Sequence, residues 1–395
     1  MLFRSFSTLG WPDDTHDLRT FYPGSIMETG YDIIFFWVAR MVMLGIQLAG
    51  DAPFHTVYLS GLIRDPEGQK MSKTKGNVVD PLGVIEETGA DALRFALIHG
   101  ATPGLDQRFG QAKLDNARNF ANKLWNATRF VLGARPEGID PAAARREPDP
   151  ARLGPAERWI RSRVAAIVAG VDRALADLNL GEVTRLLYDG IWNEFCDWGL
   201  ELAKVRLADS SLSAEDRAAT WWTLVEALDT FLRLLHPVMP FVTEELWGAI
   251  PHAPADPELL IVADWPVPAA RDGALEARVE QLVELVRGIR NARSEARVEP
   301  ALWLPVHVAL PDPLGRRRPL FHRAGLQPFC AYAVKWRNIG RCENTQSARS
   351  ASNEHDADRW PGDANTAGRQ PGPHAPLPHR RGQGQIRAGL SGLRA

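Results

Sequence analysis

The sequence of 395 residues has few cysteines and no long uninterrupted apolar run. Its three cysteines stand at positions 196, 330 and 342 in no Cys-x-x-Cys pair, which argues against a disulfide framework and favours a reducing compartment. The most apolar stretch, residues 33–43, contains Arg40 and is shorter than the roughly 20 residues of a membrane span. No signal-peptide pattern is present at the N-terminus. These absences predict a cytoplasmic protein that does not enter a membrane.

Metal-binding motifs are also missing. The ten histidines never fall three residues apart, and none belongs to a His-Glu-x-x-His sequence. Structural and catalytic zinc sites draw their ligands from such closely spaced pairs. We therefore predict no protein-bound metal ion.

The charge is nearly balanced over the whole chain but not along it. The chain has 46 Lys and Arg against 48 Asp and Glu, whereas residues 315–395 alone have 14 against 5. These last residues show no sustained hydrophobic period and are rich in Gly, Pro and Arg, which predicts a disordered basic tail. Their composition resembles translation in a wrong reading frame, and a basic RNA-binding arm is the alternative.

Residues 1–115 have the pattern of an α/β domain. Residues 55–63 are β-branched and aromatic and read as a buried strand. Asp80 and Pro81 are typical of a helix start, Gly89 of its end, and Asp91 of the start of another helix. Strand, loop and helix in succession indicate an α/β fold.

The sequence from residue 116 changes to a helical period. Apolar residues recur at spacings of three and four over 120–131, 160–178, 183–195 and 224–235, which predicts a bundle of four long helices. Gly181 is expected to end the second helix, and Ser213 with Asp216 forms a capping-box pattern before the fourth. A further helix is expected at 274–297 and a strand at 302–311.

The most distinctive feature is the sequence GQKMSKTKGN at residues 68–77, which we call the lysine loop. Three lysines, at 70, 73 and 75, crowd six positions between two glycines. A mobile loop of this kind could close over a polyphosphate, where its ammonium groups would stabilise charge that develops on a leaving group. A solvated basic loop is the alternative. The position of the loop between a strand and a Pro-started helix favours the phosphate-binding interpretation.

The lysine loop resembles the Lys-Met-Ser-Lys-Ser signature of class I aminoacyl-tRNA synthetases, with Thr74 in the last serine position. FSTLGWP, FYPGSIMETGYDIIFFWVARM, GADALRFALIHGATPG and NFANKLWNATRFVL resemble valyl-tRNA synthetases specifically, and LHPVMPFVTEELW resembles the anticodon-binding helices shared with the isoleucyl and leucyl enzymes. The block GYDIIFFWVARM disfavours another class I specificity. The resemblance covers about residues 6–310.

The resemblance implies α/β plus all-α architecture in four parts. Residues 1–115 would be the C-terminal half of a Rossmann-like nucleotide-binding domain. Residues 116–270 would be an α-helical anticodon-binding bundle, 271–314 a helix and strand extension, and 315–395 the disordered tail.

The resemblance further implies ATP-dependent activation of valine and its transfer to tRNA(Val) by a monomeric cytoplasmic enzyme, with Mg²⁺ carried on the ATP. Lys70, Ser72 and Lys73 would stabilise the departing pyrophosphate. Gly30, Asp32 and Met71 would help to bind ATP. Ile33 and Trp37, four apart on an expected helix face, would line the valine pocket, with ordinary core packing as the alternative. Five cations could meet tRNA phosphates, with a solvated helix face as the alternative: Lys123, Arg129, Arg185, Lys204 and Arg206.

The chain departs from the family in one important respect. The second class I signature, His-Ile-Gly-His, does not occur in it, and the resemblance implies that the first half of the nucleotide-binding domain and the editing domain are missing as well. The chain by itself is therefore expected not to form valyl-adenylate, and its strands are expected to expose edges and an apolar face. A non-catalytic tRNA-binding module and a non-functional gene remnant are the alternative interpretations.

Overall fold

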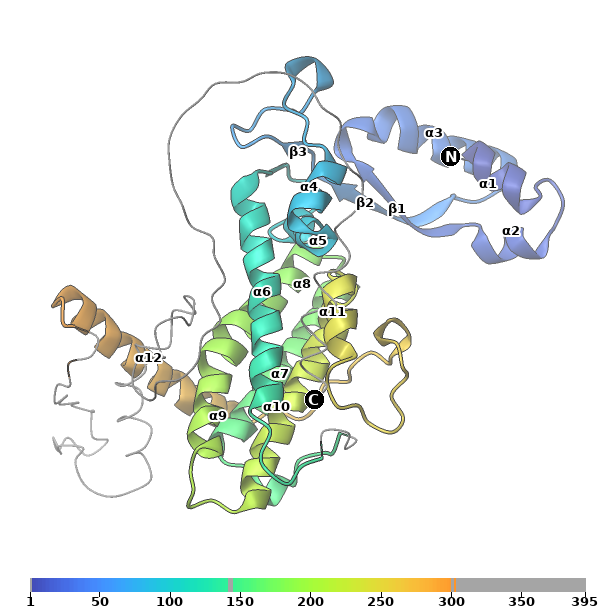
Figure 1. The fold of residues 1–395 in the computed structure, drawn as a ribbon. Helices are drawn as coiled ribbons and strands as arrows, with labels where there is room; N and C mark the ends of the chain where they lie inside the picture. Colours follow the sequence, from blue (N-terminus) through green and yellow to red (C-terminus); the bar gives the residue numbers. More distant parts are fainter. Residues whose placement is uncertain (1, 141–144, 300–301, 303–395) are drawn as a thin grey trace, which may run out of the picture. The chain divides into compact units, whose positions relative to one another are not determined.

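The computed structural model describes residues 2–140, 145–299 and 302 (Figure 1). The described residues up to Glu276 belong to one compact unit, and Ala277 begins a second. The predicted strand at 302–311 and the predicted disordered tail lie outside the described residues, except for residue 302.

The first elements of the chain form a small lobe around two parallel strands. Two short helices, α1 (Leu2–Leu9) and α2 (His16–Phe21), precede strand β1 (Gly24–Gly30), which pairs with β2 (Phe54–Ser60). A small cluster of Phe6, Met27, Val38 and Met41 forms the core of this lobe. Trp11, Tyr22, Trp37 and Phe54 pack against it while remaining partly exposed.

One continuous helical segment, residues 31–49, connects β1 to β2. It begins as a 3₁₀ turn, η1 (Tyr31–Ile33), continues as a π-helical turn, η2 (Ile34–Val38), and becomes regular in α3 (Ala39–Ala49). Gly50 then ends α3 in the left-handed conformation, at φ 78°. The sequence predicted a helix only around Ile33 and Trp37. The chain is helical there, but its first two turns are wound more tightly and then more loosely than an α-helix.

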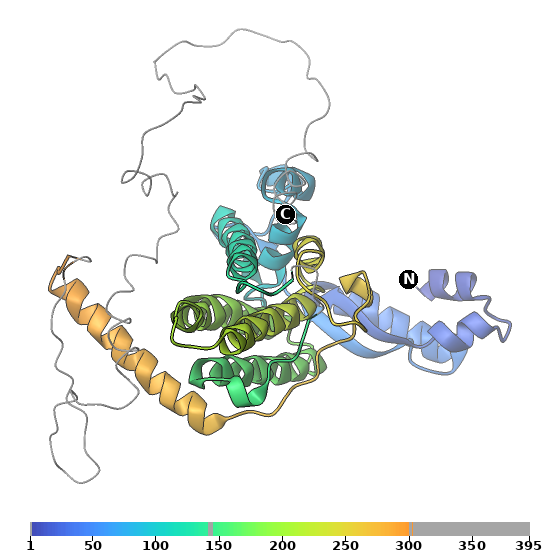
Figure 2. The same cartoon turned by 60° about the horizontal axis from the view of Figure 1, so that its bottom comes forward.

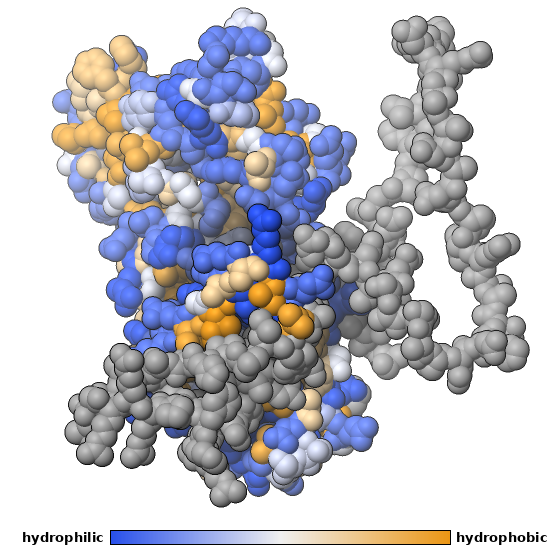
Figure 3. All heavy atoms as spheres, turned by 90° about the vertical axis from the view of Figure 1, so that its left-hand side faces the viewer, coloured by the Kyte–Doolittle hydropathy of each residue, from blue (hydrophilic) through white to orange (hydrophobic). Residues whose placement is uncertain are grey.

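The same helical segment exposes an apolar surface. Phe35 is 75% and Met43 69% exposed, and six further aliphatic or phenylalanine side chains of the segment belong to residues that are between a third and two thirds exposed: Ile33, Ile34, Phe36, Leu44, Ile46 and Leu48. On the face of the molecule that Figure 3 presents, apolar residues lie in separate patches among hydrophilic ones. The strands were expected to expose an apolar face, and Ile26 of β1 and Val57 of β2 are indeed 52% and 39% exposed. In parallel sheets both faces are normally covered, so this lobe has unburied surface of the kind that usually packs against further structure.

By length and composition this segment could also cross a membrane. Tyr31–Ala49 has 19 residues and a mean hydropathy of 1.6 in its best window, and it is the single such helix within the described ranges. The expectation that no stretch is long enough was wrong, because the helix extends beyond residues 33–43 on both sides. One such helix is weak evidence for a membrane span, since core helices of soluble proteins pass the same test.

The lobe leads into a second small parallel pairing and two helices. Strand β3 (Ile63–Arg64) pairs with β4 (Gln107–Arg108), which the sequence did not predict. Helix α4 (Pro81–Thr88) begins at Asp80, whose carboxylate accepts hydrogen bonds from the Leu82 and Gly83 backbone N–H groups, and it ends at Gly89. Both ends are as the sequence predicted. Helix α5 (Ala90–Ile98) follows directly.

The remaining helices of this unit form the predicted bundle (Figures 1 and 2). They are α6 (Gln111–Gly133), α7 (Pro155–Ala176), α8 (Leu180–Tyr188), the π-helical stretch η5 (Asp189–Gly199), α9 (Leu200–Leu207), α10 (Ala214–Leu235) and α11 (Pro240–Trp247), with short 3₁₀ turns η4 (Pro150–Arg152) and η6 (Leu260–Val262). The stretch from α8 to α9 is one unbroken helical path. Ser213 caps α10 and pairs with Asp216 as predicted.

The apolar residues expected at the bundle core are buried there. Phe120, Leu124, Leu187, Leu224 and Leu228 are essentially inaccessible to solvent. Several tryptophans of this region are also buried, among them Trp221, whose indole N–H donates to the Val131 carbonyl at 2.7 Å, whereas Trp125 and Trp192 remain partly exposed. The position of Gly181 was predicted wrongly. It lies inside α8, where a Cβ would stand 1.9 Å from the Ala101 carbonyl oxygen, while α7 ends at Ala176.

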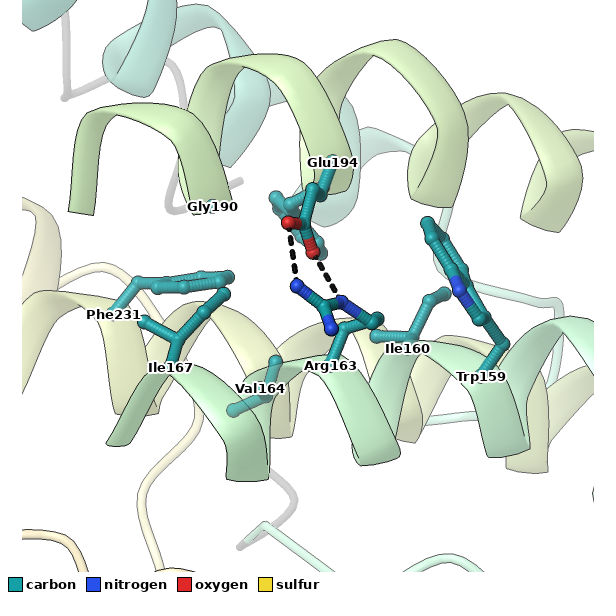
Figure 4. Close-up of a pocket in the computed structure, with 9 residues that line it drawn as sticks. Trp159, Ile160, Arg163, Val164, Ile167, Gly190, Glu194 and Phe231 are labelled. Atoms are coloured by element: carbon teal, nitrogen blue, oxygen red, sulfur yellow. Dashed lines mark hydrogen bonds and ion pairs between the residues drawn. The ribbon is translucent and has the colours of Figure 1, made fainter. Parts of the chain in front are cut away.

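Partly buried ion pairs connect α7 to η5 and to the start of α12 (Gly273–Glu295). The Arg163 guanidinium forms two hydrogen bonds with the Glu194 carboxylate, at 2.7 and 2.8 Å, beside a small cavity lined by Ile167, Gly190 and Phe231 (Figure 4). Arg163 also donates to Glu276 at 2.9 Å. Burial raises the pKa of Glu276, but hydrogen bonds from Arg271, Ser162 and Arg163 outweigh it and lower that pKa to about 2.

Phe231→Ala should destabilise the bundle strongly. Phe231 is fully buried on α10, so its loss removes a large apolar side chain and leaves a cavity, which costs about 3–5 kcal/mol. Phe241 on α11 is 67% exposed and provides the matched control, because Phe241→Ala should change stability by no more than about 0.5 kcal/mol. Urea unfolding followed by far-UV circular dichroism measures both. Equal losses would contradict the packing described for α10.

Glu276→Gln should flatten the loss of stability in acid. The folded carboxylate stays ionised down to about pH 2, whereas the unfolded chain takes up this proton near its ordinary pKa of 4.5. The unfolded state therefore binds more protons between pH 4.5 and 2, and stability falls as the pH drops through this window. Thermal unfolding between pH 5 and 3 should be less pH-dependent in Glu276→Gln, and unchanged in the exposed control Glu258→Gln. An identical slope in the two variants would refute the assignment.

Candidate active site

Gly30 and Asp32, which were expected to help to bind ATP, lie at the carboxyl end of β1, and Lys70 of the lysine loop lies close to them. The parallel register places Gly30 opposite Ser60 at the carboxyl ends of β1 and β2. In parallel α/β sheets, ligands bind beyond the carboxyl ends of the strands. Gly30 leads directly into the 3₁₀ turn that carries Asp32, and a Cβ at Gly30 would stand only 2.8 Å from the Asp32 carboxylate. Glycine at this position therefore lets the backbone and the Asp32 side chain lie close together.

A second strip of chain supports this end of the lobe. Residues 104–109 run beside residues 59–64, with backbone hydrogen bonds from Gly104 to Leu59 at 2.7 Å and from Gln107 to Leu62 at 3.1 Å. The approach is closest at Gly61, where a Cβ would meet the Leu105 carbonyl oxygen at 1.7 Å. Only glycine fits there.

Asp106 is the centre of the polar contacts in this strip. Its carboxylate accepts hydrogen bonds from the Leu62 backbone N–H at 2.8 Å, from the Arg64 guanidinium, and from the Tyr31 hydroxyl at 3.3 Å. The Leu62 hydrogen bond and the Arg64 charge hold the pKa of Asp106 below its ordinary value. Arg64 also donates to the Gly68 carbonyl at 3.3 Å, which connects Asp106 to the start of the lysine loop.

The lysine loop lies close to the turn after β1. The Lys70 ammonium is 3.4 Å from the Asp32 carboxylate, and both side chains remain accessible, at 63% and 37% exposure. Met71 and Ser72 are half-buried, and Lys73 begins the 3₁₀ turn η3 (Lys73–Lys75). The structure thus brings Gly30, Asp32 and Lys70 together, with Met71 and Ser72 on the same loop. An ammonium group that is held by one exposed carboxylate is available to an anionic ligand.

The two residues expected to line a valine pocket are placed differently from each other. Ile33 ends η1 and is 40% exposed, whereas Trp37 lies in η2 and packs against the core cluster of the lobe. The prediction that they share a helix face rested on α-helical spacing, which this segment does not have. For Trp37 the alternative interpretation, core packing, agrees with its contacts.

Four of the five cations considered for tRNA binding have carboxylate partners. Lys123 pairs with Asp197 at 3.1 Å, and Arg206 with Glu157 at 3.1 Å. Arg185 pairs with both Glu182 and Asp189, and Lys204 with Glu201. Arg129 is exposed on α6, and no ion pair is found for it among the described residues. Partnered cations offer less free charge to phosphate than an unpartnered one.

One group in the described ranges has the spacing of metal ligands. Ligand atoms of Asp229, His252 and Asp256 lie within 4.8 Å of one another. Arg233 and Arg145, however, each pair with both carboxylates, Arg233 at 2.6 Å from Asp256 and Arg145 at 3.3 Å from Asp229. Two guanidinium groups compensate the two carboxylates, so this cluster stabilises the bundle electrostatically and does not fit a cation.

Three residues of the site were not identified from the sequence. Asp106, Arg64 and Asp65 belong to no motif recognised in the sequence, yet the side chains of all three make hydrogen bonds at or beside the base of the lysine loop. The side chains that these residues contact are up to 75 positions away in the sequence, so a local pattern could not identify them.

Two family models match the chain in separate regions. Residues 3–109 match the class I tRNA synthetases for isoleucine, leucine, methionine and valine, and residues 157–308 match the anticodon-binding domain of tRNA ligases. Among curated proteins, the chain is 49% identical over 311 residues to a valine–tRNA ligase of Dehalococcoides mccartyi and 47% identical over 304 residues to that of Caulobacter vibrioides. These alignments cover 78% and 75% of this chain but 34% and 32% of those proteins. The chain therefore spans about a third of the length of these relatives.

Solved structures share the fold at low sequence identity. A ternary complex of leucyl-tRNA synthetase from Agrobacterium radiobacter has a TM-score of 0.51 at 20% identity, covering 69% of this chain and 32% of that one. Methionyl-tRNA synthetase of Mycobacterium tuberculosis, in complex with methionyl-adenylate, has a TM-score of 0.53 at 23% identity, covering 64% and 49%. The chain is therefore similar to valine–tRNA ligases over about a third of their length, and its two matched regions resemble part of a class I synthetase domain and a helical anticodon-binding domain.

Asp106→Asn should lower the thermal stability of the protein more than Asp32→Asn. Asp106 accepts three hydrogen bonds, two of them from groups that fix the strip 59–64, whereas Asp32 takes part in one exposed ion pair of the kind worth about 0–1 kcal/mol. We expect Asp106→Asn to lower the melting temperature measurably and Asp32→Asn to leave it nearly unchanged. Differential scanning fluorimetry compares the two. A larger effect of Asp32→Asn would contradict the described arrangement.

Proposed function

We propose that this chain serves the reaction of a valine–tRNA ligase: ATP-dependent activation of valine followed by transfer to tRNA(Val). In this reaction the valine carboxylate attacks the α-phosphorus of ATP, pyrophosphate leaves, and a ribose hydroxyl of the tRNA then displaces AMP from the adenylate. The identity of 49% to a curated valine–tRNA ligase is the observation that carries the proposal.

The lysine loop would act on the leaving pyrophosphate. Lys70 would place its ammonium group, now paired with exposed Asp32, on the phosphate oxygens, and Ser72 would add a hydroxyl donor. The second lysine of the signature, Lys73, is proposed from the sequence alone to do the same. Preorganised donors at the site where charge develops lower the barrier of such a step. Mg²⁺ carried on the ATP would neutralise further phosphate charge.

The turn after β1 would hold the nucleoside and the amino acid. Gly30 leaves room for close approach of the substrate to the backbone, and Asp32 could accept hydrogen bonds from ribose hydroxyls once Lys70 turns to phosphate. Met71 would contact the nucleotide from the loop. Ile33 and Trp37 would contribute apolar surface to the valine pocket. Ile33 is exposed and could therefore contact the ligand directly. Trp37 packs against the core of the lobe and would instead hold Ile33 in place from behind.

The helical bundle would bind the tRNA. Phosphate contacts need accessible positive charge more than exact geometry. Arg129 is the best placed of the five candidate cations, and Lys123, Arg185, Lys204 and Arg206 would have to leave their carboxylates. We further propose that the protein is cytoplasmic and monomeric.

A non-catalytic tRNA-binding module is the second candidate. The bundle has a complete buried core, while the lobe with the lysine loop exposes apolar residues 31–49. A protein of this construction could keep tRNA binding without adenylate formation. The two candidates differ in whether ATP chemistry occurs.

Exchange of pyrophosphate into ATP and tRNA binding together test the proposal. The 395-residue chain should shift tRNA(Val) in a gel, and it should not by itself support valine-dependent exchange. Replacing the matching segment of the Dehalococcoides valine–tRNA ligase with residues 6–310 should give a chimera that exchanges with valine and not with isoleucine. Lys70→Ala in the chimera should lower the exchange rate about 10²–10³-fold.

Matched variants separate the two parts of the test. Lys204→Ala, on the bundle, should leave exchange unchanged. Arg129→Ala should weaken tRNA binding and reduce its salt dependence by about one counterion, and Arg185→Ala, whose charge is already paired, should have a smaller effect. A chimera that folds and binds tRNA without exchange would favour the tRNA-binding module. Absence of tRNA(Val) binding in every form would overturn both candidates.

A further inference from the structure

We propose that Asp65 and Asn77 are positioning residues that clamp the two ends of the lysine loop together, so that the loop presents Lys70 and Ser72 at a fixed place beside the turn after β1. The functional part of this inference rests on the proposed function, whereas the clamp itself can be tested without it.

The first end of the loop is a tight turn closed by Asp65. The Asp65 backbone N–H donates to the Gln69 carbonyl at 3.0 Å, and the Gly68 N–H donates to the Asp65 carbonyl at 2.9 Å. Gly68 has φ +84°, which a residue with a side chain rarely adopts. Arg64 forms an antiparallel bridge with Lys70. Lys70 thus leaves the turn from a backbone position fixed against the end of β3.

The Asp65 side chain is buried in this turn, with 7% of the residue exposed. One carboxylate oxygen accepts the Gln69 backbone N–H at 2.6 Å, and the other accepts the side-chain amide of Asn77 at 2.8 Å. The carboxylate therefore joins the beginning of the loop to its last residue. The hydrogen bond from Asn77 is the main reason that the pKa of Asp65 lies below its ordinary value.

Asn77 completes the connection with the other atoms of its amide. Its carbonyl oxygen accepts the Ser72 backbone N–H at 2.9 Å, and its NH₂ group reaches both Asp65 and, at 3.5 Å, the Lys70 carbonyl. One side chain thus contacts both sides of the loop. An amide is suited to this position because it offers a donor to the carboxylate and an acceptor to the backbone N–H at the same time.

The tip between Ser72 and Asn77 makes its hydrogen bonds mostly within itself. The Lys75 N–H donates to the Ser72 carbonyl at 3.1 Å, and the Ser72 and Thr74 hydroxyls are 2.6 Å apart. Gly76 has φ +70° and no atom within 4 Å of a Cβ placed on it. The tip is therefore a small self-contained turn in open space. Its place relative to β1 is determined by the clamp at its base together with the exposed Lys70–Asp32 pair.

Exchanging the two side chains provides a test that distinguishes a clamp from a merely sensitive position. Asp65→Asn would place an NH₂ group against either the Gln69 backbone N–H or the Asn77 side-chain NH₂, both of which now donate to the carboxylate. Asn77→Asp would set two carboxylates against each other while keeping an acceptor for Ser72. The double variant Asp65→Asn with Asn77→Asp restores a complementary amide and carboxylate, with both backbone N–H groups still accepted.

Amide hydrogen exchange of the complete 395-residue chain, read at Gln69 and Ser72, measures the clamp directly. Each single variant should speed exchange at these two amides about tenfold or more, and the double variant should return it to within about twofold of the original. Amides of α6 serve as the internal reference for folding. Asn126→Asp, an exposed asparagine on α6, is the control and should change neither loop amide.

The same variants in the active chimera test positioning. The single variants should lower kcat for pyrophosphate exchange about tenfold with the KM for valine unchanged, and the double variant should recover most of kcat. Unaltered amide exchange in both single variants, or no recovery in the double variant, would overturn the clamp. Amide exchange that behaves as expected in a chimera without any valine-dependent activity would leave the clamp standing and refute the proposed function instead.

Discussion

The candidate site depends on the close pairing of residues 59–64 with residues 104–109. This pairing requires a glycine at 61, because any Cβ there would overlap the Leu105 carbonyl. It places Asp106 where its carboxylate reaches Leu62, Arg64 and Tyr31 at once. The lysine loop leaves from one of these strips, and the other leads through Gly110 into α6. The Gly61–Leu105 contact and the Asp106 carboxylate therefore place the strip from which the loop leaves, and the Asp65–Asn77 clamp and the Lys70–Asp32 pair then place the loop relative to β1.

The two halves of the first unit have different energetic character. The bundle buries large side chains such as Trp221, Phe231 and Leu228 almost completely, and it pairs many of its charged groups, as Arg163 does with Glu194 and Glu276. The lobe has a small core and leaves much of residues 31–49 in solvent. Two parallel strands with a small core bury little apolar surface by themselves. We therefore expect the bundle to hold most of the stability of this unit, while the chemistry proposed for the lysine loop belongs to its less stable part.

The sequence was informative wherever structure follows from local chemistry. Asp80 with Pro81, and Ser213 with Asp216, predicted helix starts correctly because a cap bonds to residues two or three positions away. The core positions of the bundle followed from helical spacing. The 3₁₀ and π turns before α3 could not be predicted in this way, because an apolar run such as IIFFWV fits several helical windings equally well. Gly181 misled because a glycine can end a helix or permit a close contact within one, and only the neighbouring Ala101 decides between them.

The lysine loop illustrates which part of a site a motif can reveal. Lys70, Ser72 and Lys73 are recognisable because their residue types carry the chemistry. Asp65 and Asn77 are twelve residues apart and carry no chemistry of that kind, so nothing in the sequence marks them as partners. A flexible cationic tip can stabilise developing charge only if its mean position is right, because an ammonium group displaced by a few ångströms loses its hydrogen bond and roughly half of its Coulomb energy. The side chains that fix the base of such a loop are therefore as necessary to its action as the lysines, and they become visible only in the folded structure.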